Sequence, residues 1–205
     1  MEKVVVISLG GSLIIPDEID LSFLEKFKQV IKKHESNYNF IVVCGGGSIA
    51  RKYISALKES KKSEYLQSMA GISITRVNAR FMTYLFGKDA NEGIPHNMNH
   101  IKNLLRTNKI VFCGSLRYAE KETSDSTAAK LARFFKTEFI NLTIVPGLFT
   151  KNPVQFKDAK FIPEISWREF HKRAEKIKYS PGQHFVLDQN ASKIIRNNKI
   201  KTYIL

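Results

Sequence analysis

Short apolar runs that end in glycine constrain the fold of this chain most strongly. "VVVISLGG" ends at Gly10-Gly11, and "FIVVCGGG" repeats the pattern at residues 40–47. Each run is apolar throughout instead of alternating, which is typical of a strand buried on both faces of a sheet. A segment with helical spacing follows each run, so the glycines stand at strand-to-helix turns. These two units predict a parallel or mostly parallel sheet.

The rest of the chain continues the alternation of strands and helices. We expect helices at residues 21–34, 48–60, 64–86, about 101–106, 123–135, 166–177 and 189–198. We expect further strands at 3–9, 109–114, 138–145 and 199–205, and a Gly/Pro-punctuated loop at 146–165 with a possible small hairpin. The pattern predicts an α/β fold with helices on both faces of the sheet, in one domain that spans residues 1–205.

Several helix starts carry residues that cap the free backbone N–H groups. We expect helices to begin at the capping box of Ser22 and Glu25, at Ser124 or Asp125, at the capping box of Ser166 and Glu169, and at Asp188.

The charge balance favours anionic ligands. Lys and Arg number 33 against 19 Asp and Glu, a formal charge of +14. The cations are spread along the chain, with short clusters at 61–62, 102–109 and 172–178, and no nucleic-acid-binding motif accompanies them. We therefore expect a solvated basic surface and small phosphate-bearing ligands, with no dedicated nucleic-acid interface.

Other features favour a cytoplasmic protein. No apolar run approaches the roughly 20 residues that span a membrane. The first expected strand begins so early that it leaves no room for a signal peptide. Cys44 and Cys113 each end an expected buried strand and are interpreted as small core residues. The histidines lack metal-ligand spacing, so no metal site is assigned to them: His34, His96, His100, His171 and His184.

Glycine or small polar residues follow four expected strands, at the edge where ligands bind in such sheets. These segments are Gly10-Gly11-Ser12, Gly45-Gly46-Gly47-Ser48, Gly114-Ser115 and Thr143 to Gly147. Glycine lets backbone approach an anion closely, and the following helix offers unpaired N–H groups. The alternative is that the glycines only make tight turns. Neither glycine turn has the P-loop pattern or the G-x-G-x-x-G pattern of dinucleotide-binding folds.

Two further features carry both a chemical and a structural interpretation. Arg51 lies one helical turn beyond the second glycine turn, where it either faces a phosphate or is a surface arginine. The segment "TSDST", residues 123–127, places hydroxyl groups and the carboxylate of Asp125 at a helix start. It is either an ordinary N-cap, or a site where hydroxyls donate to phosphate and Asp125 orients a basic group or Mg²⁺.

With these residues identified, the chain resembles the amino acid kinase superfamily, and within it the archaeal-type UMP kinases. Seven segments, in the family's order, carry the resemblance: "ISLGGSLIIP", "VVCGGGSIARKYI", "GISITRVNARFM", "TSDSTAAKLA", "NLTIVPGLFTKNP", "DAKFIPEIS" and "VLDQNASKIIRNNKIKTYIL". The resemblance implies a three-layer αβα sandwich that transfers the γ-phosphoryl of Mg·ATP to UMP. It also implies a homo-oligomer, a dimer or hexamer, with an acceptor side at about 1–125 and a nucleotide side at about 126–205.

The resemblance assigns roles residue by residue. Gly10, Gly11 and Ser12 would face the transferred phosphates, and Asp125, Gly10 and Gly11 would form the catalytic centre. The other implied contacts are Gly45 and Gly46 between acceptor and donor, with Arg51 nearby; Gly114, Thr123 and Ser124 toward the acceptor; and Thr143 and Phe149 toward adenosine.

Several ligand positions depart from the family pattern. Ser8 stands where many members have lysine, Ser68 and Asn152 stand where the family usually has Asp, and Ile144 and Pro146 replace residues of a "TNVDG" motif. Residues 115–122 replace a Gly-rich acceptor loop, and relatives continue beyond Leu205 by roughly a helix and a strand. The missing cation could be replaced by Lys121, Lys151 or Lys193. The alternative function is a catalytically weak paralogue that binds nucleotide or anion as a regulatory or structural subunit.

Overall fold

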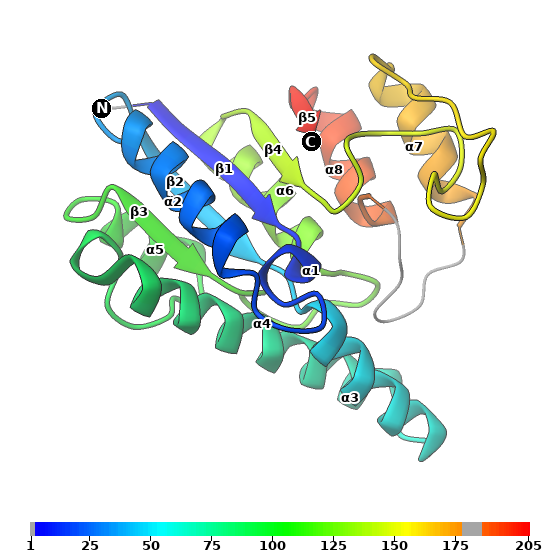
Figure 1. Ribbon diagram of the computed structural model, residues 1–205, viewed down its shortest axis with the longest axis horizontal. Helices are drawn as coiled ribbons and strands as arrows, with labels where there is room; N and C mark the ends of the chain where they lie inside the picture. The colour runs from blue at the N-terminus through cyan, green and yellow to red at the C-terminus, as the bar shows by residue number, and fades with distance from the viewer. Residues whose placement is uncertain (1–2, 178–185) are drawn as a thin grey trace.

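A central parallel sheet organises the molecule, and a computed structural model describes it over residues 3–177 and 186–205 (Figure 1). Its strands are β1 (Lys3–Leu9), β2 (Tyr38–Cys44), β3 (Ile110–Cys113), β4 (Phe139–Leu142) and β5 (Thr202–Ile204). The order across the sheet is β3-β2-β1-β4-β5, and every neighbouring pair is parallel. The expected parallel sheet is therefore confirmed. β4 ends three residues before the expected end at 145, because the chain turns away there to line a cleft.

Helices connect the strands and cover the sheet. They are α1 (Gly11–Ile14), α2 (Leu21–His34), α3 (Gly47–Glu59), α4 (Glu64–Phe86), the 3₁₀ turn η1 (Gly87–Asp89), α5 (Met98–Leu104), α6 (Ser124–Phe135), α7 (Trp167–Glu175) and α8 (Gln189–Asn198). The longer helices lie where helical spacing predicted them. The single turn α1 was not expected, since four residues are too few to show a helical period.

The strands are apolar throughout because both faces of the sheet are covered. In β1, Val5, Ile7 and Leu9 pack with α2 and α4, whereas Val6 packs with α6 and α8 on the other face. β2 and β3 alternate in the same way. Figure 1 shows α2 and α4 on the viewer's side of the sheet and α6 behind it. The αβα layering expected from the resemblance is confirmed.

The structure corrects two expected helix starts and confirms two. α2 is capped by Asp20, not Ser22, because the Asp20 carboxylate accepts from the backbone N–H of Phe23 at 2.9 Å. α6 is capped by Thr123, not by Ser124 or Asp125. The capping box of Ser166 and Glu169 forms as expected at α7. Asp188 caps α8 as expected.

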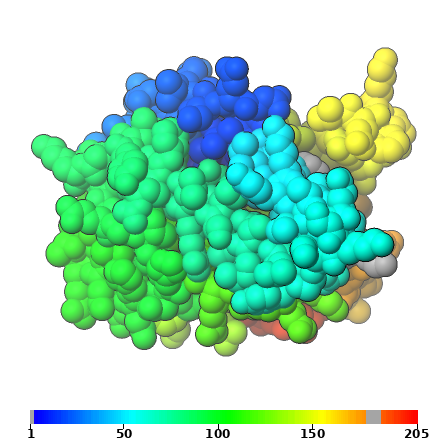
Figure 2. Space-filling view, turned by 90° about the horizontal axis from the view of Figure 1, so that it is seen from below, coloured from blue at the N-terminus to red at the C-terminus, as the bar shows by residue number. Residues whose placement is uncertain are grey.

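The space-filling view places α3 and α4 side by side on one face, with the segment near residue 150 projecting at a corner (Figure 2). Both cysteines are buried and free, as expected for core residues. None of the helices in the described part of the chain combines the length and apolar character needed to cross a bilayer.

Candidate functional site

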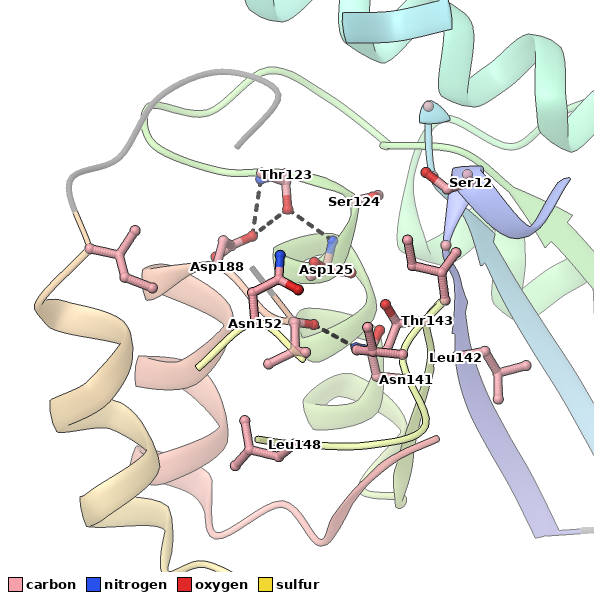
Figure 3. Close-up of a pocket in the computed structure, with 18 of the residues that line it drawn as sticks. Ser12, Thr123, Ser124, Asp125, Asn141, Leu142, Thr143, Leu148, Asn152 and Asp188 are labelled. Atoms are coloured by element: carbon pink, nitrogen blue, oxygen red, sulfur yellow. Dashed lines mark hydrogen bonds between the residues drawn. The ribbon is translucent and has the colours of Figure 1, made fainter. Parts of the chain in front are cut away.

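A cleft of about 1040 Å³ opens at the carboxyl ends of β1, β2 and β4 (Figure 3). Both glycine turns, the start of α6, the segment 141–153 and one face of α7 line it. All but one of the residues assigned to the site from sequence line the cleft. Those that line it are Gly10, Gly11, Ser12, Gly45, Gly46, Arg51, Thr123, Ser124, Asp125, Thr143 and Phe149. The fold therefore brings together assigned residues from Gly10 to Phe149, which are 139 positions apart in the chain.

Gly114 is the exception. A Cβ atom built there would lie 2.6 Å from Thr75 Oγ1 and 2.7 Å from the backbone N of Arg76. The position of Gly114 therefore requires glycine for close packing of β3 against α4, and the residue is absent from the cleft lining. The neighbouring Ser115 lines the cleft instead.

The two glycine turns touch each other and form one backbone wall. A Cβ atom at Gly11 would lie 2.0 Å from the backbone N of Gly47 and 2.6 Å from the carbonyl carbons of Gly45 and Gly46. Gly47 itself has φ +64°, a left-handed conformation that glycine adopts readily. The glycines thus serve the close approach of two loops as well as the turns. The wall leaves bare backbone facing the cleft, where an anion can approach N–H groups.

Arg51 connects the two turns. Its guanidinium donates to Ser12 Oγ across 3.3 Å. Burial lowers the pKa of Arg51, although an arginine stays protonated in a protein. Of the two interpretations open for Arg51, the structure favours the one that faces the cleft.

Asp188 fixes the start of α6. Its two carboxylate oxygens accept from the Thr123 hydroxyl at 2.5 Å, the Ser126 hydroxyl at 2.7 Å and the backbone N–H of Ala191 at 2.6 Å. It also accepts from the backbone N–H groups of Thr123 and Ser126. One buried carboxylate therefore joins the first turns of α6 and α8. The Thr123 hydroxyl is engaged here and also accepts from the backbone N–H of Asp125.

Asp125 is the carboxylate that the first turn of α6 places in the cleft. Its Oδ1 accepts a hydrogen bond from Ser8 Oγ at 2.8 Å. Burial, aided by the charge of Asp188, raises the pKa of Asp125 to about 7, while the Ser8 hydrogen bond opposes this shift. Ser8, on β1, is almost fully buried. The position that carries lysine in many superfamily members thus carries a neutral hydroxyl group that contacts Asp125.

The segment after β4 forms the opposite wall of the cleft. Thr143, Phe149 and Asn152 lie along it, and Phe149 packs edge-on against Phe161 with 5.5 Å between ring centroids. The two phenylalanines also form an isolated antiparallel bridge, in place of a full hairpin. Of the two departures in this segment, Ile144 lines the cleft and Pro146 does not.

Between α3 and α4 the cleft has a mainly apolar end. Ile54, Gly71 and Ile72 line it, together with Ser68 and Thr75.

The loop 115–122 packs against α4 beside this end. The Arg76 guanidinium donates to the carbonyl oxygens of Ser115 at 3.1 Å and Leu116 at 2.7 Å. Tyr65 on α4 packs edge-on against Tyr118, at 4.8 Å between ring centroids. The charged loop 115–122 is therefore held in place by specific contacts.

Three cations that α7 brings to the cleft were not assigned to the site from the sequence: Lys172, Arg173 and Lys176. Their helical spacing was visible, but nothing in the sequence showed which face of α7 meets the cleft. Of the three lysines considered as replacement cations, Lys151 lines the cleft and Lys121 and Lys193 do not. Lys151 is paired with Asp158 at 2.6 Å.

Among residues 3–177 and 186–205, no three His, Cys, Asp or Glu side chains are grouped as a metal site. Lys178 and His184 lie outside the described residues.

A sequence model of the amino acid kinase family matches residues 3–205. The chain belongs to the amino acid kinase family. The uridylate kinase of Methanobrevibacter smithii is 30% identical over 201 residues, covering 98% of this chain and 88% of the relative. The uridylate kinase of Methanococcus maripaludis strain C7 is 33% identical over 204 residues, covering 98% and 89%.

Solved structures in this family share the fold. The uridylate kinase of Archaeoglobus fulgidus superposes with a TM-score of 0.83 at 31% identity, covering 100% of this chain and 90% of that one. Aspartate kinase from Synechocystis has a TM-score of 0.73 at 18% identity, covering 98% of this chain and 37% of that one. At that identity, the second match supports the fold alone. Of the departures from the family pattern, Ser68 and Asn152 line the cleft, whereas Ser8 is buried and contacts Asp125, which lines the cleft.

Proposed function

We propose that this protein transfers the γ-phosphoryl group of ATP, with Mg²⁺, to UMP. The observation that carries the proposal is the placement of Asp125. Two contacts hold it where the glycine turns meet the start of α6. Ser8 holds its carboxylate from β1, and Asp188 fixes the helix turn that carries it. Relatives at 30–33% identity over nearly the whole chain are named uridylate kinase, which supports UMP as the acceptor.

Two flanks of the cleft suit the two nucleotides. We assign the donor to the segment 143–153, where Thr143 and Phe149 would contact adenosine. The acceptor would lie toward Thr123, Ser124 and the apolar end between α3 and α4. We propose the same division for the whole chain. Residues up to about 125 would form the acceptor side, and those from about 126 would form the nucleotide side.

The residues present fit a magnesium-bound nucleotide. Mg²⁺ in such sites is usually held by one or two carboxylates together with substrate phosphates, so a cage of protein ligands is unnecessary. Asp125 supplies a carboxylate at the glycine wall, and a bare backbone cradle lies beside it. When bound, Mg²⁺ would neutralise charge on the phosphates.

The chain's own groups would act mainly by positioning. An oxygen of the UMP phosphate attacks the γ-phosphorus of ATP. The bond from that phosphorus to the β,γ-bridging oxygen breaks, so that UDP forms and ADP is released. The attacking oxygen already carries negative charge, so no general base is required. The glycine wall, through its N–H groups, and Arg51 would hold the phosphates in line and stabilise their charge.

An ADP-release assay with Mg·ATP and a panel of nucleoside monophosphates tests the proposal. Turnover of UMP at about 1 per second or faster, with little turnover of AMP or CMP, is the expected result. ATP binding measured by calorimetry without turnover of any acceptor would contradict the proposal and favour the binding-only paralogue.

We further propose a homo-oligomeric assembly, a dimer or hexamer, in the cytoplasm. The outer face of α4 exposes Leu66, Val77 and Tyr84, with 45%, 60% and 73% of their surface accessible, which supports burial against a second copy. The two free buried cysteines support a reducing compartment. Sedimentation velocity of the purified protein tests the assembly, and a monomer at micromolar concentration would contradict it.

A further inference from the structure

One face of α7 forms a cationic wall along the cleft. Glu169, Lys172, Arg173 and Lys176 all line the cleft, and their spacing of three, four and seven residues places them on one side of the helix. The opposite side is buried, since Phe170, His171 and Ala174 pack inward, and α7 lies against α8. The helix is therefore fixed with its cationic face toward the cleft.

Several acidic groups lie near these cations. Glu169 accepts from the Ser166 hydroxyl at 2.8 Å in the capping box of α7, and its charge also interacts with Arg173 and Lys172. Asp188 is occupied by the helix starts that it caps. Glu164 also lines the cleft and is exposed, so its charge offsets part of the wall. The cationic wall of α7 therefore keeps a surplus of positive charge.

The cleft holds two other cations, Arg51 and Lys151. Lys151 is paired with Asp158, whereas Arg51 donates to the neutral hydroxyl of Ser12 and keeps its charge. Within residues 3–177 and 186–205, the side chains of Lys172, Arg173 and Lys176 have no hydrogen bond or ion pair with another residue. Ser8 supplies no charge at the base of the cleft. In the described cleft, the cations that remain available to a polyanionic ligand are thus Arg51 and the three of α7.

We propose that Lys172, Arg173 and Lys176 bind the phosphate chain of the donor nucleotide. This inference rests on the proposed function, because it takes ATP as the donor. ATP carries several negative charges, and long exposed side chains on a fixed helix can meet them without desolvating other groups. The three residues contribute to binding of the nucleotide and not to the transfer step. Their loss therefore raises KM for ATP and leaves kcat largely unchanged.

The test compares two triple variants that remove the same charge. Lys172→Gln, Arg173→Gln and Lys176→Gln together neutralise the wall. Lys157→Gln, Lys160→Gln and Arg168→Gln together remove three exposed cations outside the cleft. Calorimetry measures the Kd of ATP, ADP, AMP and adenosine for each protein, with Mg²⁺ at constant ionic strength.

We expect the α7 variant to bind ATP about tenfold more weakly or worse, with a smaller loss for each phosphate removed and no loss for adenosine. The matched control keeps its affinity within about twofold, because exposed charges outside the cleft are screened. Unchanged ATP affinity in the α7 variant, or an equal loss for adenosine, overturns the inference. Failure of the wild-type protein to bind ATP also overturns the inference.

These binding measurements use no acceptor, so they separate this inference from the proposed reaction. A chain that fails to phosphorylate UMP, yet loses ATP affinity when the α7 wall is neutralised, would retain the donor site and contradict only the reaction. A chain that phosphorylates UMP with unchanged KM for ATP in the α7 variant would contradict only the wall.

Discussion

Ser8 on β1 donates a hydrogen bond to Asp125 on α6, with 2.8 Å between Ser8 Oγ and Asp125 Oδ1. The two residues are 117 positions apart. The bond links the central strand of the sheet to the helix turn that carries the proposed catalytic carboxylate. A hydroxyl at this place orients the carboxylate, whereas a lysine would add charge.

The ionisation of Asp125 should appear in the pH profile of turnover. Its pKa of about 7 means that a large fraction of the protein holds a neutral Asp125 near neutral pH. We expect turnover of UMP to rise with pH through this value, because the ionised carboxylate is the form that organises Mg·ATP. Asp125→Asn should lower turnover about a hundredfold or more at every pH and remove the titration from the profile. A wild-type profile that is flat from about pH 5.5 to 8.5 would contradict this role.

The same ionisation should weaken the fold as pH rises. The ordinary pKa of 3.8 applies to the unfolded chain, and the folded value is higher. Between these two values the folded protein keeps a proton that the unfolded chain has released. The free energy of unfolding therefore falls with rising pH across this window. Asn does not titrate, so Asp125→Asn lacks this loss. The free energy of unfolding of the variant minus that of wild type, measured by urea unfolding, should therefore increase from about pH 5 to pH 8.

Ser8→Ala tests the hydrogen bond to Asp125 directly. Loss of the bond removes the interaction that favours the charged carboxylate, so the apparent pKa of turnover should shift upward. Stability should fall by about 1 kcal/mol, which is typical for one lost hydrogen bond. Ser55→Ala, at an exposed position on α3, is the control and should leave the apparent pKa unchanged without lowering stability. A lower apparent pKa in Ser8→Ala would refute the orientation that the structure shows.

Gly11→Ala should destabilise the protein strongly. The new Cβ would lie 2.0 Å from the backbone N of Gly47, and backbone on both sides leaves no flexible group to move aside. We expect a loss of about 3 kcal/mol in urea unfolding, at the upper end of overpacking effects. Gly71→Ala in α4 is the matched control. Its Cβ would meet only the mobile end of Ile54 at 3.2 Å, so the gain in helix propensity should leave stability unchanged or raised by up to about 1 kcal/mol. Equal losses in the two variants would contradict the close contact of the turns.

Asp188→Ala should cost more than loss of an ordinary helix cap. The substitution leaves several buried donors of Thr123, Ser126 and Ala191 without an acceptor, and we expect a loss of about 3–5 kcal/mol. Asp20→Ala removes a single exposed cap from α2 and should cost about 1 kcal/mol. Thermal unfolding of both variants measures the difference. Similar losses would show that Asp188 acts as a cap for α8 alone.

The sheet and its turns could be predicted because their signals are local. Continuous apolar strands followed by glycine indicate a parallel sheet with its ligand edge at those glycines, and the order of elements needs no knowledge of distant contacts. The capping box at Ser166 was predictable for the same reason, since both partners lie three residues apart.

The contacts inside the cleft depend on pairs that the sequence does not place together. Thr123 caps α6 because its hydroxyl reaches both Asp125 and Asp188, and only folding brings Asp188 near. Gly114 looked like a ligand residue at a strand end, but its glycine serves packing against Thr75. The cations of α7 show a helical period, yet the packing of α7 on α8 decides which face meets the cleft.

The position of β1 at the middle of the sheet has a consequence for divergence within this architecture. The chain builds β2 and β3 on one flank of β1, then crosses to build β4 and β5 on the other. Ligands that bind at such a crossing contact the two flanks through separate loops. Mutations in one flank can therefore alter one partner of a transfer reaction while the glycine wall that both partners share stays intact. Under the proposed reaction, such a layout would allow new acceptors to be recruited without rebuilding the donor half.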